Sequence, residues 1–200
     1  FNNFQSNESG FLSLVYQSGY LTIKSYDKES KMYTLGLPNF EVTDGFYSNL
    51  AMKLTSLPPN SLGITAENFR KALRDKDLAK LEKLLNTAVA NLPYLNKKTL
   101  YEDMYRNVLH MIFTLTGFNV IGEYACNCGR ADIVVQTPKF VYIFELKMQN
   151  GADLDAKAQE ALEQIDLQNY AGRFDATGKE IIKIALVFGD NLKGLGKMAY

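Results

Sequence analysis

Apolar and polar positions alternate most clearly in the second half of the chain, where the pattern predicts four β-strands. They are expected at residues 120–125, 131–136, 141–148 and 181–188, all rich in β-branched or aromatic residues. A turn centred between Pro138 and Lys139 joins the second and third strands into a hairpin. The fourth strand is apolar except for Lys183, which is typical of a strand covered on both faces.

Helical spacing of apolar residues flanks these strands. One helix is predicted from Leu100 to about Thr116, with Thr99 as its N-cap and Gly117 at its end. Another is predicted from about Asp153 to Tyr170. The resulting order α-β-β-β-α-β predicts an α/β domain in which helices cover a sheet, and the tail from Gly189 carries no clear pattern.

The first sixty residues predict a small hairpin followed by a helix. Residues 11–17 suit a short helix or a strand, and strands at 20–24 and 32–37 surround a polar turn. Asn39 can cap a helix over residues 41–54, and the Pro-rich stretch 57–61 is expected to end it.

A basic amphipathic helix or helix pair is predicted from Thr65 onward. Its Lys and Arg residues form either a solvated face or a phosphate-contacting surface, and the solvated face is the more ordinary interpretation.

Three charged residues, Asp132, Glu145 and Lys147, interrupt the apolar strands of the second half. The turn position puts Asp132 directly opposite Glu145, and strand alternation puts Lys147 on the same face. Opposed residues have Cβ atoms about 5 Å apart, so like charges there destabilise the sheet unless they are neutralised. A divalent cation does this with carboxylate ligands, and a neighbouring lysine can orient or deprotonate a water. The pattern indicates a metal-dependent hydrolytic site; a surface hairpin with an ordinary ion pair is the alternative.

Asp132 followed by Glu145-x-Lys147 on the next strand resembles the PD-(D/E)XK nuclease signature. The resemblance implies a restriction-endonuclease-like core, a mixed sheet flanked by helices, over residues 99–200. It also implies phosphodiester hydrolysis with Mg²⁺, for which Mn²⁺ can substitute. Asp132, Glu145 and the Leu146 carbonyl would hold the metal, and Lys147 would assist the water nucleophile. DNA is expected as substrate ahead of RNA.

The resemblance implies two further site residues. Tyr101-Glu102-x-x-Tyr105 stands where related nucleases carry a helix glutamate, although Glu102 can also simply stabilise a helix N-terminus. Gln164 resembles the family glutamine that follows the Glu-x-Lys strand, where it would orient the lysine or the water. The spacing from Gln164 to Tyr170 is longer than the family's usual Gln-x-x-x-Tyr, and an ordinary helix-surface glutamine is the alternative.

The segment QSGYLTIKSYD…YTLGLPNFEV resembles the region that joins an AAA-ATPase-like domain to a PD-(D/E)XK nuclease in a bacterial family. This implies a winged-helix-like remnant of an ATPase-like region at residues 1–60, a helical connector at 61–98 and the nuclease-like domain at 99–200. It also implies an upstream ATPase-like domain as partner in the same polypeptide. No Gly-x-x-x-x-Gly-Lys-Ser/Thr phosphate loop occurs here. Phe1, with neither Met nor a basic segment, is expected to be an internal boundary of a longer protein.

Composition bounds the remaining possibilities. With 46% hydrophobic and 22% charged residues, the chain resembles a globular protein in water, and no apolar run is long enough to span a bilayer. Two cysteines one residue apart suit neither a disulfide framework nor a zinc site with a single histidine, so reduced thiols and a cytoplasmic location are expected.

Charge separates two functional hypotheses. The chain has no net charge, and from Leu100 onward 10 Lys or Arg face 13 Asp or Glu, which gives −3. The missing basic surface favours a catalytically inactive nuclease-like module that binds nucleic acid or protein beside an ATPase. The intact Asp, Glu and Lys set favours the enzyme.

Overall fold

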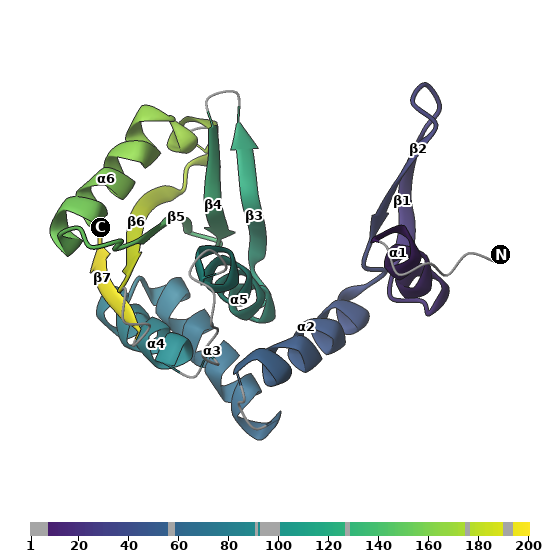
Figure 1. The fold of residues 1–200 in the computed structure, drawn as a ribbon, viewed down its shortest axis with the longest axis horizontal. Coiled ribbons are helices and arrows are strands. Elements are labelled where there is room, and N and C mark those ends of the chain that lie inside the picture. The colour runs from purple at the N-terminus through teal and green to yellow at the C-terminus, as the bar shows by residue number, and fades with distance from the viewer. Residues whose placement is uncertain are drawn as a thin grey trace. The chain divides into compact units, whose positions relative to one another are not determined.

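The structure is a computed structural model that describes residues 8–55, 59–90, 92, 101–126, 129–174, 177–189 and 194–200. The chain forms two compact units, one ending at Leu50 and the other beginning at Ala51 (Figure 1). Within the described residues, no helix is both long enough and apolar enough to cross a membrane.

The first unit is a helix and a hairpin followed by the start of a second helix. Helix α1 (Glu8–Gln17) ends where Gly19 adopts a φ of +81° and the Tyr20 N–H donates to the Val15 carbonyl at 3.1 Å. Tyr20 therefore belongs to the helix C-terminus. As a result, strand β1 (Thr22–Asp27) begins two residues later than predicted, and it pairs antiparallel with β2 (Met32–Gly36).

A predicted turn and a predicted helix cap are confirmed in this unit. The Asp27 carboxylate accepts hydrogen bonds from the Glu29 N–H at 2.9 Å and the Ser30 hydroxyl at 2.8 Å, which closes the turn between the strands. Helix α2 (Phe40–Thr55) begins after Asn39, whose side-chain oxygen accepts from the Val42 N–H at 2.9 Å.

The basic amphipathic region is a helix pair, α3 (Pro59–Asp75) and α4 (Leu78–Ala90). The predicted break at 57–61 is wrong at its end because Pro59 starts α3; the first helical turn requires no N–H donor, so proline fits there. Residues 56–58 lie outside the described residues.

Ion pairs cover much of the basic face of this helix pair. Arg70 and Lys71 lie 3.8 and 3.5 Å from Glu67. Arg74 pairs with Asp75 at 2.9 Å, and Lys76 pairs with Glu180. These contacts favour the solvated face over a phosphate-contacting surface.

The second unit is built on a five-stranded mixed sheet. Its strands are β3 (Asn119–Cys126), β4 (Gly129–Gln136), β5 (Phe140–Met148), β6 (Glu180–Phe188) and β7 (Leu195–Ala199), adjacent in that order. The first three form the predicted antiparallel meander, β6 is parallel to β5, and β7 is antiparallel to β6. The prediction missed β7, since Gly194 and Gly196 weaken its strand pattern. The arrangement is that of a restriction-endonuclease-like fold.

Helices cover both faces of this sheet (Figure 1). On one face, α3, α4 and α5 (Tyr101–Leu115) share a core with inward residues of the strands. Phe69 of α3, Phe113 of α5 and Phe144 of β5 belong to this core. On the other, α6 (Leu154–Leu167) buries Ala158, Ala161 and Ile165. The connector helices α3 and α4 are therefore part of the packed core of this unit.

Both long helices of the nuclease-like region end close to the predicted positions. Gly117, at φ +76°, follows the end of α5, while the predicted cap Thr99 and Leu100 lie outside the described residues. Helix α6 starts after Asp153, which caps it through the Ala156 N–H at 3.0 Å. It stops at Leu167 rather than Tyr170 because Asn169 adopts a φ of +46°, and a 3₁₀ turn (Tyr170–Arg173) follows.

Tyr142 of β5 ties the connector to the sheet, and its removal tests that link. Its buried hydroxyl donates to the Leu73 carbonyl of α3 at 2.7 Å. We expect Tyr142→Phe to lower the free energy of unfolding by about 1–3 kcal/mol, because a buried carbonyl loses its donor. Urea unfolding monitored by circular dichroism measures this. Tyr26→Phe, at a tyrosine 46% exposed in the hairpin, is the control; equal losses in both variants would contradict the structural role.

Candidate functional site

The turn between β4 and β5 fixes the register of the charged hairpin. The Phe140 N–H donates to the Thr137 hydroxyl at 2.9 Å, and the Thr137 N–H donates to the Phe140 carbonyl at 2.8 Å. Ile133 consequently lies opposite Phe144, which is the predicted register. Continuing that register by one residue puts Asp132 opposite Glu145.

Asp132 is buried and both of its carboxylate oxygens have donors. Oδ2 accepts the Leu146 N–H at 2.8 Å, and Oδ1 accepts Arg106 Nη1 of α5 at 3.1 Å. The backbone pairing of β4 with β5 ends at Ile133, and beyond it the Asp132 side chain takes over as acceptor for β5. Burial raises the pKa of Asp132, while the Leu146 amide and the Arg106 charge oppose that rise.

Glu145 has fewer stabilising contacts than Asp132. It is 3% exposed, its Oε1 lies 3.7 Å from Lys147 Nζ, and its Oε2 has no hydrogen-bond partner among the described residues. Burial, and secondly the negative charge of Asp132, raise the pKa of Glu145 to about 8. At neutral pH, much of this carboxyl group is therefore protonated when no metal ion is bound.

Helix α6 brings Gln164 to the lysine of the hairpin. Lys147 Nζ donates to Gln164 Oε1 at 2.5 Å and lies 3.9 Å from Glu160 of the same helix. The predicted placement of Gln164 beside Lys147 is therefore observed. Tyr170, by contrast, is buried in the core with Val134.

Helix α5 contributes an acidic and a basic residue. Glu102 is exposed in the first turn, yet burial and the charge of Asp132 raise its pKa, and Lys147 lowers it. Glu102 thus lies within electrostatic reach of the predicted site. Asp103, the next residue of the helix, pairs with Arg106, which in turn contacts Asp132.

Sequence reasoning missed two residues of this cluster, Arg106 and Glu160. Arg106 lies four residues after Glu102 on the same helix face, a spacing that could have indicated it. Glu160 lies four residues before Gln164 on α6 in the same way. The side chain of Arg130, a second cation near Asp132 in the sequence, lies outside the described residues.

The donor atoms suit a hard divalent cation. Carboxylate oxygens from Asp132 and Glu145 are the ligands that such ions prefer, and the buried Glu145 Oε2 is without a hydrogen bond in the described part of the chain. No group of three or more His, Cys, Asp or Glu side chains that could hold a metal occurs among the described residues. A metal here would therefore rely on two carboxylates together with main-chain or water oxygens.

The raised pKa of Glu145 predicts a pH-dependent stability. The native state keeps a proton that the unfolded state releases, so stability should fall as pH rises from about 4.5 to about 8. The loss should approach about 1.4 kcal/mol per pH unit within this window. Urea unfolding of the metal-free protein at pH 5 and pH 8 measures it. Glu145→Gln should flatten the dependence of stability on pH, whereas Glu163→Gln, at an exposed position of α6, should leave it unchanged. An unchanged pH dependence in Glu145→Gln would refute the assignment.

Comparison with known proteins gives one relative and one family. The chain is 28% identical over 182 residues to a protein of Azotobacter chroococcum mcd 1 described as "Uncharacterized protein in vnfD 5'region". The match covers 88% of this chain and 34% of that protein, so the chain spans about a third of the relative's length. No solved structure matches the chain. Residues 100–194, which include every predicted site residue, match the family model of the PD-(D/E)XK nuclease superfamily.

Proposed function

We propose that residues 99–200 form a metal-dependent nuclease that hydrolyses phosphodiester bonds, with DNA preferred to RNA. The observation that carries this proposal is the cluster of Asp132, Glu145 and Lys147 on one hairpin, with Gln164 bonded to the lysine. The family match over residues 100–194 supports it. Nucleases of this superfamily generally use divalent metals, and we propose Mg²⁺ here, with Mn²⁺ as a substitute.

Asp132, Glu145 and the Leu146 carbonyl would hold the metal. A residue in an extended strand directs its N–H and C=O toward the same neighbouring strand. Since the Leu146 N–H meets Asp132, its carbonyl is directed to that side as well. The bound ion would supply positive charge to the phosphate and acidify a water.

Lys147 would position the water nucleophile and compensate the charge that develops on the phosphate. Gln164 fixes the ammonium group through the 2.5 Å hydrogen bond without adding charge of its own. Glu102, from the neighbouring helix α5, would complete the acidic side of the site.

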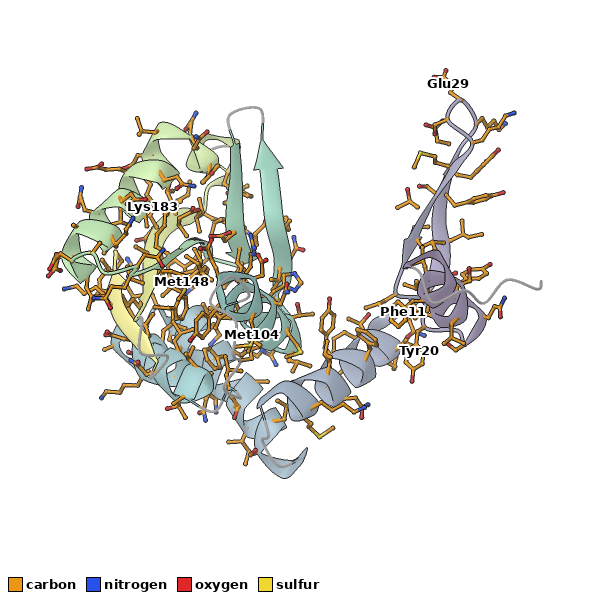
Figure 2. All side chains as sticks on the ribbon, in the orientation of Figure 1. Phe11, Tyr20, Glu29, Met104, Met148 and Lys183 are labelled. Atoms are coloured by element: carbon orange, nitrogen blue, oxygen red, sulfur yellow. The ribbon has the colours of Figure 1, made fainter. Side chains whose placement is uncertain are left out.

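A second candidate is an inactive nuclease-like module attached to an ATPase-like region. The net charge of −3 after residue 99 and the ion-paired face of α3 favour it, because both limit the cationic surface available to nucleic acid. Residues 1–60 would then be the winged-helix-like end of that region. Exposed apolar side chains of the first unit, including Phe11 and Tyr20 (Figure 2), suit contact with further protein. Either function would operate in the cytoplasm.

Cleavage assays separate the two candidates. Labelled DNA and RNA are incubated with the protein and Mg²⁺, Mn²⁺ or chelator. Lys147→Met and Asp132→Asn should each lower cleavage by about 100-fold or more, because they remove the catalytic ammonium and a metal-binding charge. Lys183→Met, which breaks a surface pair with Asp166, is the control and should cut normally. A wild type that cuts neither nucleic acid with any metal, yet binds nucleic acid as well as both variants do, would establish the inactive module.

Metal binding should also stabilise the fold. A ligand that binds only the native state raises the free energy of unfolding by about 2.7 kcal/mol at 100 times its dissociation constant. We therefore expect Mn²⁺ to raise the melting temperature of wild type and of Lys147→Met, which keeps both carboxylates. Glu145→Ala should lose the increase. The same Mn²⁺ response in Glu145→Ala as in wild type would mean that the ion binds elsewhere.

A further inference from the structure

Arg106 is held between two carboxylates at the edge of the proposed metal site. Its Nη1 lies 3.1 Å from Asp132 Oδ1, and its Nη2 pairs with Asp103 Oδ1. The Arg106 side chain is 14% exposed and that of Asp132 is 11% exposed, whereas that of Asp103 is 62% exposed. The guanidinium therefore has one buried and one solvated partner.

The contact with Asp132 engages an oxygen that a metal would need. The other oxygen, Oδ2, already accepts the Leu146 N–H at 2.8 Å. A carboxylate has further lone pairs, so hydrogen bonding alone does not exclude a metal. Charge does oppose it, because a dication at Asp132 would stand within a few ångströms of a guanidinium in a poorly solvated site.

We propose that Arg106 is an internal counter-cation that competes with the metal ion for Asp132 and so lowers the metal affinity of the site. This inference rests on the proposed metal-dependent function. Arginine keeps its charge at all relevant pH values, so the competition does not depend on a proton. Metal binding moves the guanidinium toward Asp103, which already holds its other end at the surface.

This displacement has a consequence for substrate binding. The guanidinium that leaves Asp132 presents hydrogen-bond donors that suit phosphate oxygens. A phosphate that binds Arg106 would in turn free Asp132 and increase metal affinity, since coupling between two ligands is reciprocal. Arg106 thereby acts as a positioning residue that links metal loading to the arrival of a polyanion.

Direct measurement of Mn²⁺ binding tests the competition. Titration calorimetry gives the dissociation constants of wild type, Arg106→Met and Arg70→Met. Methionine keeps much of the arginine stem and removes its charge. Arg106→Met should bind Mn²⁺ at least about fivefold more tightly, the lower end of ordinary coupling energies. Arg70 also lies near an acid three residues earlier, Glu67, but both side chains are on the exposed face of α3, so its variant should match wild type.

Asp103→Asn supplies a second test with the opposite sign. It removes the charge of the solvated partner, keeps the contact between Arg106 and Asp132, and should weaken Mn²⁺ binding. In the Arg106→Met background the same substitution should have a smaller effect, which a double-mutant cycle detects. An equal effect in both backgrounds would show that Asp103 acts through its own charge and would overturn the displacement.

The outcomes separate this inference from the proposed function. If wild type binds Mn²⁺ and Arg106→Met binds it equally or more weakly, while remaining folded by circular dichroism, Arg106 only supports Asp132 and the inference is wrong. If neither protein binds Mn²⁺, the proposed metal site fails and the inference fails with it. Binding by Arg106→Met alone would support a competition strong enough to block the wild-type site.

Discussion

Two buried carboxylates on adjacent positions of one hairpin impose the constraint that the rest of this site must satisfy. Asp132 and Glu145 occupy sheet positions where apolar residues would make the fold more stable, because buried charge without full compensation is destabilising. The surrounding structure compensates them unequally. Asp132 receives a main-chain amide and a guanidinium, whereas Glu145 has a lysine 3.7 Å away and one oxygen without a hydrogen bond in the described residues. Such a local violation of packing rules is characteristic of a functional site.

The compensating groups come from both helical layers, so the site depends on the complete sandwich. Helix α5 on one face of the sheet contributes Arg106, and helix α6 on the other face contributes Gln164. Each helix is positioned by apolar residues that contribute nothing to the chemistry, such as Phe113 in α5 and Ile165 in α6. Helix α3 joins the same core and is bonded to β5 through Tyr142. A change in the connector can therefore reach the strand that carries Glu145.

The sequence predicts those features that depend on local patterns. Strand alternation and the turn at Pro138 gave the β4–β5 register, because a two-residue periodicity and a fixed turn leave little freedom. Features that depend on packing were missed. The partnership of Arg106 with Asp132 requires α5 to lie beside β4, which no local pattern encodes. Strand β7 pairs with β6 despite Gly196, and its Met198 is buried in the core. Gln164 and Tyr170 differ in environment because Asn169, with its positive φ, ends the helix between them.

The acidic charge of the nuclease-like region can be reconciled with a polyanionic substrate. Several of its acidic residues, including Glu102, Asp132, Glu145 and Glu160, gather around the proposed metal site. They make the electrostatic potential negative at the place where a cation would bind, and less so over the rest of the surface. A bound dication would offset two of the three net negative charges and put positive charge where the phosphate reacts. Attraction to nucleic acid would then arise at the metal-loaded site itself. Through Arg106, phosphate binding and metal binding would favour each other, because coupling between two ligands is reciprocal.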